Sequence, residues 1–337
     1  MGARSATRRF KYLLAGILAA LVVWSIVWFV AATIVDRQIA RAEKMALDRD
    51  AILVCAERHV TGYPFRVVVR CESGSKVGAN GRKIALGGLT VAAQVYDPAH
   101  IIARVDTPAR LHFANGAEIE ANFGLAHASA QIDLSSGALR QLVAEIVDMG
   151  MSAGPATLAV AELDLSLRRN PDMPDNLDIA LQVRDAVPRE GLEPFDFILR
   201  GQVAGGSALL QGAPRDLAQR AAVDGLPIII EAAEFACGDM VVTLKGTLGI
   251  KPDGLIDGTV DVAVAGYEAG LPYVSTMNPH AEMVLTTLLT NFFANAPVTM
   301  VGNKEARSIS ITIDDGRIKP GGWFTVGTIP PLPFRFY

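Results

Sequence analysis

The stretch CAERHVTGYPFRVVVRC, residues 55–71, places two of the chain's three cysteines at the ends of one short segment. Thr61-Gly62-Tyr63-Pro64 has turn composition, because glycine tolerates a positive φ and proline fixes its own φ. The valine-rich run that follows, residues 65–69, predicts a returning strand. Cys55 and Cys71 are equally far from Tyr63, so an antiparallel hairpin folded about that residue would bring the two cysteines opposite each other.

This hairpin predicts a disulfide between Cys55 and Cys71, which would persist in an oxidising compartment. In the chain-entropy model, closing a loop of this size contributes about 3 kcal/mol to the free energy of unfolding. Two alternatives remain open. One is a pair of unrelated thiols, and the other is a metal site with His59, although metal-binding cysteines usually lie only about two to four residues apart. The third cysteine, Cys237, is expected to be a small buried apolar residue.

An uncharged apolar segment, residues 13–35, precedes the cysteines. As a helix it would be about 34 Å long, enough to cross a hydrocarbon core of about 30 Å. Positive charges stay on the cytoplasmic side of a membrane, and the short N-terminal tail carries Arg4, Arg8, Arg9 and Lys11. The alternative is a cleavable secretory signal, whose apolar core is normally shorter.

The sequence therefore predicts a single-pass membrane protein with its N-terminus in the cytoplasm and the bulk of the chain exported to the other side of the membrane. The predicted parts are a cytoplasmic tail (1–12), a transmembrane anchor (13–35), a helical stalk (36–50) and an exported β-rich domain (51–337) with a seam near residues 201–214.

Beyond the stalk, apolar and polar residues alternate, which predicts an antiparallel sheet with one buried face. The alternating runs are 119–125, 177–183, 260–264 and 309–313, and the hairpin-type turns are Asn115-Gly116, Asp253-Gly254, Asp257-Gly258 and Asp315-Gly316. Helical periodicity is expected in 138–149, in a helix that opens at Asn278-Pro279, and in 215–222. The predicted fold is mainly β (α+β): one N-terminal transmembrane helix, then an extended, antiparallel, strongly twisted sheet with two or three amphipathic helices packed on it.

The motif Gly62-Tyr63-Pro64-Phe65-Arg66 between Cys55 and Cys71, together with the apolar anchor and the charged helical stretch, resembles the bacterial domain-of-unknown-function family 2125. The run 311–318 before a proline-rich end fits the same family. The resemblance implies an inner-membrane protein that faces the periplasm, and it implies no activity. A more remote similarity in pattern, to AsmA-like envelope proteins, points to lipid movement or outer-membrane upkeep.

Catalytic constellations are missing from the sequence. The histidines are dispersed without ligand spacing, no Gly-x-Ser-x-Gly elbow occurs, and Gly78-Ala79-Asn80-Gly81-Arg82-Lys83 has the wrong spacing for a phosphate loop. We therefore expect no enzyme, no cofactor and no bound metal. A mild net charge of −4 and an aromatic content of 7% argue against a nucleic-acid partner.

Two apolar surfaces are the candidate sites for a hydrophobic ligand or a docking partner. One is a helical stripe with Val284, Leu288 and Phe292, and the other is the C-terminal tail with Trp323, Phe324, Phe334 and Phe336. Each surface alternatively packs on the protein's own sheet. We hypothesise a non-enzymatic envelope protein that binds or helps to transport lipid or another hydrophobic ligand. The alternatives are a scaffold or adaptor subunit of an envelope assembly, and a hydrolase with a site built from distant loops.

Overall fold

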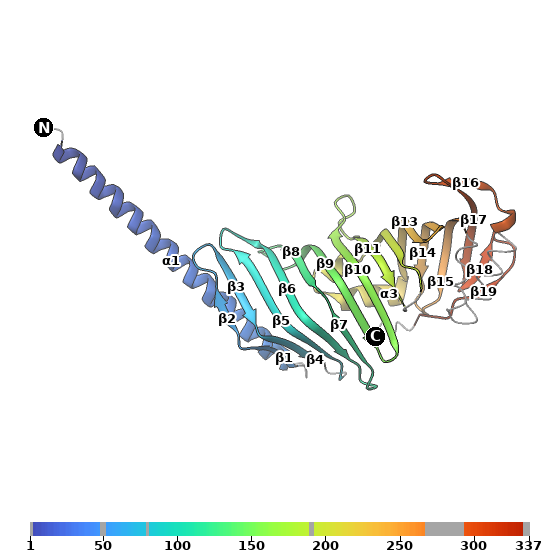
Figure 1. Cartoon of the computed structure of the whole chain (residues 1–337), viewed down its shortest axis with the longest axis horizontal. Helices are drawn as coiled ribbons and strands as arrows, with labels where there is room; N and C mark the ends of the chain where they lie inside the picture. Colours follow the sequence, from blue (N-terminus) through green and yellow to red (C-terminus); the bar gives the residue numbers. More distant parts are fainter. Residues whose placement is uncertain (1–2, 48–51, 79–80, 189–191, 267–292, 333–337) are drawn as a thin grey trace. The chain divides into compact units, whose positions relative to one another are not determined.

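The computed structural model of the 337-residue chain describes residues 3–47, 52–78, 81–188, 192–266 and 293–332. The protein is mostly strand, at 57%, in a large antiparallel sheet, with one long apolar helix at its N-terminus (Figure 1). The predicted mainly β fold is thus confirmed. The chain divides into two compact units, Met1–Asn122 and Phe123–Tyr337.

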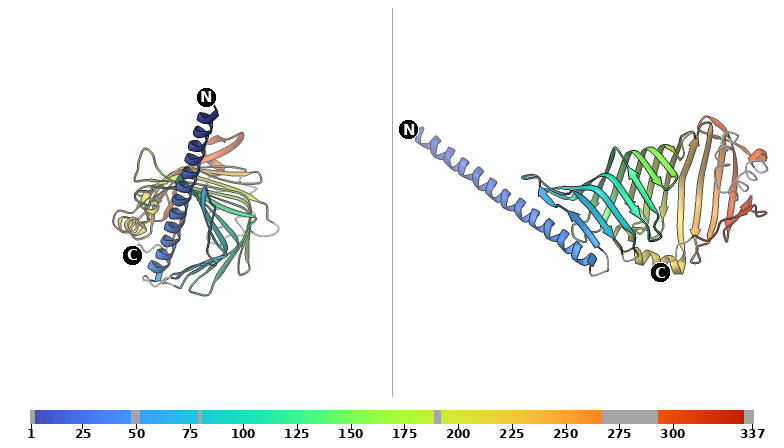
Figure 2. Two further views of the ribbon diagram at one scale, coloured as in Figure 1. Left: turned by 90° about the vertical axis from the view of Figure 1, so that its left-hand side faces the viewer. Right: turned by 60° about the horizontal axis from the view of Figure 1, so that its bottom comes forward.

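The first unit begins with α1 (Ala3–Leu47), which contains the whole apolar segment. Its part Phe10–Leu47 includes an 18-residue window with a mean hydropathy of 2.6, and it is the one helix of the described residues that is long and apolar enough to cross a membrane. The residues after Val35 are good helix formers such as alanine, arginine and lysine. The helix therefore continues into this charged segment and lies against β1, β2 and β3 (Figures 1 and 2).

Seven strands complete the first unit. They are β1 (Ile52–Ala56), β2 (His59–Thr61), β3 (Arg66–Cys71), β4 (Ser73–Val77), β5 (Lys83–Gln94), β6 (Asp97–His112) and β7 (Glu118–Asn122). β1 pairs with β4, and β2 pairs with β3. β3 and β4 each pair in turn with a different part of β5. β6 pairs with the other edge of β5, and β7 pairs with β6.

The predicted hairpin and disulfide form, but the hairpin register differs from the prediction. β2 and β3 pair His59 with Arg70 and Thr61 with Val68, so the hairpin folds between Pro64 and Phe65 rather than about Tyr63. Cys55 consequently pairs with Gly74, not with Cys71. The strand is interrupted between β1 and β2, where Glu57 has a φ of 46°. The Cα atoms of the two disulfide-bonded cysteines are 5.2 Å apart.

The second unit is a meander from β8 to β15 that continues into β17, β18 and β19. Its earlier strands are β8 (Leu125–Ile132), β9 (Leu139–Ala153), β10 (Ala156–Arg169), β11 (Leu177–Val187) and β12 (Phe195–Val203). The later ones are β13 (Leu226–Cys237), β14 (Met240–Ile250), β15 (Ile256–Ala265), β16 (Val298–Val301), β17 (Lys304–Asp314), β18 (Arg317–Pro320) and β19 (Gly327–Thr328). A buried cluster that includes Val260, Val262, Phe293 and Ile311 forms its core, and Cys237 is buried as expected.

The predicted helix 138–149 is wrong, because these residues belong to β9. β9 pairs with β8 on one edge and with β10 on the other. Its valines and isoleucines favour a strand over a helix, so the two strand pairings decide the conformation despite the helical spacing of apolar residues. Ser135 and Ser136 form the turn before β9. The amides of Ser135 and Ser136 donate to Asp133 Oδ1 at 2.9 and 3.2 Å.

Asp257-Gly258 is not a turn, although the other three predicted Asn-Gly and Asp-Gly turns join consecutive strands. Gly258 lies inside β15 with a φ of +139°, and a Cβ there would stand 2.2 Å from the Thr247 carbonyl oxygen. Glycine is required at this position because the two strands approach closely there. The sequence around Gly258 does not show whether the glycine serves such an approach or a turn.

Two short helices lie between β12 and β13, α2 (Ser207–Leu210) and α3 (Pro214–Asp224). α3 confirms the predicted helix at 215–222 and buries Leu217 and Ala221. Residues 201–214 contain the end of β12 and α2, and the seam expected there stays a prediction. The helix expected from Asn278-Pro279 falls outside the described residues. The 3-10 turn η2 (Phe293–Asn295) precedes β16.

Candidate functional site

Two tryptophans attach the apolar helix to the first hairpin. Trp24 Nε1 donates a hydrogen bond to the Pro64 carbonyl oxygen at 2.9 Å, and Trp28 Nε1 donates to the Arg66 carbonyl oxygen at 2.7 Å. An indole N–H that is removed from water needs a partner. The turn carbonyls supply that partner, so the hairpin is held against one face of α1.

The aromatic ring of Tyr63 strengthens the same contact. It lies edge-on to Trp28 at a centroid distance of 5.5 Å and stacks on Phe29 at 6.3 Å. Its hydroxyl is 2.8 Å from Ser25 Oγ. Gly62 makes the turn possible, because its φ is +102° and a Cβ there would lie 2.6 Å from the Arg66 carbonyl oxygen. The predicted motif 62–66 is therefore the segment that joins helix and sheet.

Charged contacts replace the aromatic ones further along α1. Arg58, between β1 and β2, places Nε 2.9 Å from Asp36 Oδ1 and Nη1 3.2 Å from Glu43 Oε2. Asp36 is the first ionisable residue after the apolar segment. The region of α1 beyond Val35 thus lies in a polar environment while it still packs on the sheet.

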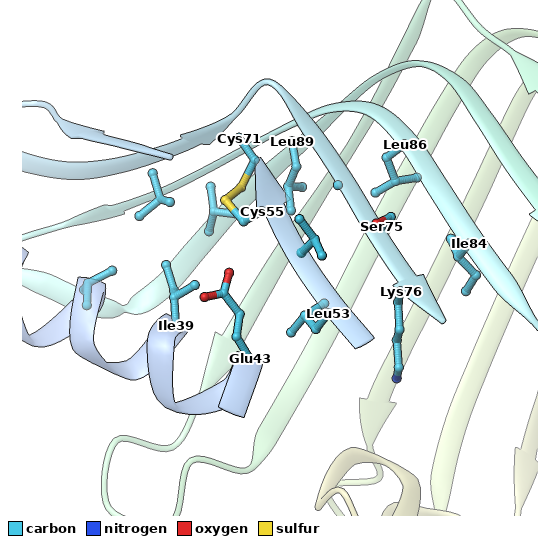
Figure 3. Close-up of a pocket in the computed structure, with 15 residues that line it drawn as sticks. Ile39, Glu43, Leu53, Cys55, Cys71, Ser75, Lys76, Ile84, Leu86 and Leu89 are labelled. Carbon is cyan, nitrogen blue, oxygen red and sulfur yellow. A yellow bond between two sulfur atoms is a disulfide. The ribbon is translucent and has the colours of Figure 1, made fainter. Parts of the chain in front are cut away.

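An apolar cavity of about 450 Å³ lies between this part of α1 and the sheet of the first unit (Figure 3). We call it the helix-side cavity. Val35, Ile39 and Glu43 line it from α1, where a four-residue spacing places them on one face. The remaining wall consists of Leu53, Val54, Cys55, Val69, Cys71, Gly74, Ser75, Lys76, Ile84, Leu86, Leu89 and Val91.

Glycines in the sheet shape the helix-side cavity. Gly74 is part of the cavity wall and leaves space there because it has no side chain. A Cβ at this position would meet only Leu86 atoms, at 3.7 and 3.8 Å. In β5 the ladder shifts at Gly87-Gly88. A bulge of this kind changes which alternate residues share a face of the sheet. Before the bulge, residues 84 and 86 line the cavity, and after it residues 89 and 91 do. A Cβ on Gly87 would stand 2.2 Å from the Thr107 carbonyl oxygen.

The chemistry of the cavity wall suits a hydrocarbon and offers little to a polar ligand. Glu43 is paired with Arg58, and Lys76 extends at the edge of the lining residues (Figure 3). The disulfide sulfurs contribute further apolar surface. The lining residues Ile84 and Val54 are 46% and 41% exposed. Apolar side chains of the cavity wall are therefore left uncovered by the described part of the chain.

A second candidate, three carboxylates in the second unit, is an ion-pair network. Ligand oxygens of Asp257, Asp314 and Asp315 lie within 4.8 Å of one another. Lys251 contacts both Asp315 and Asp257, and these two carboxylates raise the pKa of its ammonium. Lys319 Nζ lies 2.6 Å from Asp314 Oδ2 and lowers the pKa of that carboxyl. Arg317 adds a third cation, with Nη2 3.2 Å from Asp315 Oδ2. Because three cations balance the three carboxylates, we assign the cluster to closing the turns around it.

In a polar pocket of about 400 Å³ in the second unit, several lining side chains bond to one another or to the backbone. Arg168 pairs with Asp178 at 2.9 Å, and Gln202 donates to Glu231 at 2.7 Å. Buried Asn170 accepts from the backbone amides of residues 172 and 173. Its groups therefore maintain the local loop and strand pairing.

Of the predicted ligand-binding residues, the structure describes Trp323 and Phe324, and neither lines the helix-side cavity. Val284, Leu288, Phe292, Phe334 and Phe336 lie outside the described residues. Trp323 and Phe324 are 87% and 57% exposed and belong to the second unit.

Sequence reasoning missed the cavity because its walls come from five separate elements. The available signal was Gly87-Gly88 inside a strand-like run, since glycine in a strand often marks a bulge.

Comparison with known proteins gives one family. The family model described as "Uncharacterized protein conserved in bacteria (DUF2125)" matches residues 28–330. No curated protein and no solved structure matches the chain.

Proposed function

The chain belongs to this DUF2125 family of uncharacterized proteins conserved in bacteria, and we propose for it a role as a membrane-anchored, non-enzymatic protein that holds a lipid acyl chain in the helix-side cavity. The observation that carries the proposal is the position of this cavity. It is lined by the same helix that is apolar enough to span a membrane, beyond the apolar segment.

The distance along α1 supports a site outside the hydrocarbon core. From Trp28 to Val35 the helix rises about 10 Å, and from Trp28 to Glu43 about 22 Å. Asp36 and Glu43, both paired with Arg58, lie on this stretch. An apolar cavity that begins at Val35 and extends beside this charged stretch is close enough to receive a chain from the bilayer.

The size and lining of the cavity fit a single chain. A volume of about 450 Å³ falls within the range of about 300–1,000 Å³ for small-molecule sites. Exposing a methylene group to water costs about 0.8 kcal/mol, so an apolar wall allows a chain to leave the bilayer while most of it stays out of water. Lys76 at the edge is placed to contact an anionic headgroup.

The proposed location is the bacterial inner membrane, with the N-terminus in the cytoplasm and both units in the periplasm. The basic residues before the apolar segment support this orientation. The Cys55–Cys71 disulfide supports an oxidising compartment. Envelope maintenance is the corresponding cellular role.

Photo-crosslinking of full-length protein in bilayers tests the acyl-chain site. A phospholipid with a diazirine at the end of one acyl chain is activated, and labelled peptides are identified by mass spectrometry. We expect label in peptides from residues 52–56 and 83–94 as well as in α1. Gly74→Leu places a side chain into the cavity and should abolish the sheet labels while α1 remains labelled.

Gly150→Leu is the matched control, because Gly150 is an exposed strand residue whose Cβ would meet nothing within 4 Å. It should retain the wild-type label pattern. Label confined to α1 in the wild-type protein would contradict the proposal. That result would favour the scaffold alternative, for which the exposed Trp323 and Phe324 offer a docking surface.

A further inference from the structure

The first unit carries exposed aromatic residues at the ends of two hairpins. One end is the turn 62–65 between β2 and β3, and the other is Val95-Tyr96 between β5 and β6. We call them the hairpin tips. The Val95 amide donates to the Phe65 carbonyl oxygen at 3.0 Å, so the two tips adjoin. Tyr63, Phe65 and Tyr96 are 53%, 63% and 67% exposed.

Four backbone carbonyls in and beside the first tip are already hydrogen-bonded within the protein. The carbonyl oxygens of Gly62 and Phe65 accept from backbone amides, at 3.2 and 3.0 Å. Those of Pro64 and Arg66 accept from the indoles of α1. A turn in water has no need of such partners, whereas backbone groups near lipid must be satisfied internally. The first tip therefore meets a condition for entering a bilayer.

The position of the first tip along α1 sets its depth. If the hydrocarbon core begins at Leu13, Trp28 lies about 22 Å along the helix, which is about 8 Å short of the far boundary of a core of about 30 Å. Interfacial elements bury their apolar face about 5–10 Å into the headgroup and acyl boundary. The Tyr63 ring of the first tip lies edge-on to Trp28 at this depth, and the Pro64 carbonyl bonds Trp24, which lies about 6 Å deeper along the helix.

We propose that the hairpin tips insert into the outer boundary of the bilayer beside α1, as a second membrane contact of the first unit. Tyr63, Phe65 and Tyr96 supply the aromatic side chains that are favoured at this depth. Arg66 is exposed next to them and extends its guanidinium to lipid phosphates. The contact depends on α1 spanning the membrane, and it is independent of whether the helix-side cavity holds an acyl chain.

Spin labels on the full-length protein in phospholipid vesicles test this contact. Phe65→Cys and Tyr96→Cys are each made in a Cys237→Ala background and labelled without reductant, so that the disulfide stays intact. The control is Ala114→Cys, an exposed position in the turn between β6 and β7. It lies at the other end of β6, about 50 Å away along the strand.

Accessibility to oxygen, which concentrates in lipid, is compared with accessibility to a water-soluble nickel complex. We expect the oxygen-to-nickel ratio at positions 65 and 96 to be severalfold higher than at position 114. A ratio at either tip equal to that at 114 would overturn the proposal. Protection from both reagents would also overturn it, because it would indicate a tip covered by protein. Tyr96 provides a second reading if Phe65→Cys disturbs the packing on Trp24.

Discussion

Individual hydrogen-bond donors connect the parts of the first unit. Tryptophans in an apolar helix are expected near the membrane interface, and nothing in their local sequence indicates a specific acceptor. In the structure, Trp24 and Trp28 each bond one carbonyl of the motif 62–66. Trp28 is only 6% exposed and packs with Ala32 and Val67. The polar atom of this residue therefore determines where the hairpin sits on α1.

Trp28→Phe is expected to lower the free energy of unfolding by about 1–3 kcal/mol, because the Arg66 carbonyl loses its donor in a mostly buried site. Denaturant titration of the detergent-solubilised protein measures the change. Trp323→Phe is the control, since Trp323 is 87% exposed, and it should be indistinguishable from wild type. Equal effects of the two substitutions would show that the indole N–H of Trp28 contributes nothing to stability.

A local sequence pattern predicts a strand or a helix correctly only where the pairing with adjacent segments favours the same conformation. Run 260–264 was recognised from its alternation and pairs on both edges as β15. Segment 139–153 has apolar residues at both helical and strand spacing, and its pairing with β8 and β10 makes it a strand. The hairpin between the cysteines shows the same effect: its turn composition is visible in the sequence, whereas its register appears only in the pairing of β2 with β3 and of β3 with β5.

The Cys55–Cys71 disulfide joins positions 16 residues apart. Replacing both cysteines by alanine should therefore lower the free energy of unfolding by about 3 kcal/mol. Reducing agent should lower the stability of wild type by a similar amount and leave the double variant unchanged. Cys237→Ala, which keeps the disulfide, should respond to reductant as wild type does. A wild-type protein indifferent to reductant would contradict the stabilising role.

At the scale of the whole molecule, α1 contains a segment long and apolar enough to cross a membrane, and the described strands form two antiparallel units. Basic residues lie before the apolar segment, and the first ionisable residue after it is Asp36. This asymmetry favours a cytoplasmic N-terminus. Both proposed membrane-proximal features, the helix-side cavity and the hairpin tips, would then face the periplasmic side.

A phosphatase reporter that is active only outside the cytosol should be active when fused after Tyr337. A fluorescent protein that matures only in the cytosol should stay dark at the same position. Replacing Arg4, Arg8, Arg9 and Lys11 by glutamate should reduce phosphatase activity, because orientation depends on these charges. The opposite reporter pattern in the native chain would place the units in the cytoplasm and remove the basis for the envelope role.

The sequence by itself determined the long apolar helix, the disulfide partners, several strands and one of the short helices. These features follow from hydropathy, residue period and turn chemistry, which depend on residues close together in the chain. Only the tertiary structure decided that 139–153 is a strand, that Cys55 faces Gly74, and that residues of α1, β1, β3, β4 and β5 enclose a cavity. These outcomes depend on contacts between segments far apart in the chain, and no local pattern records which distant segment supplies the neighbour.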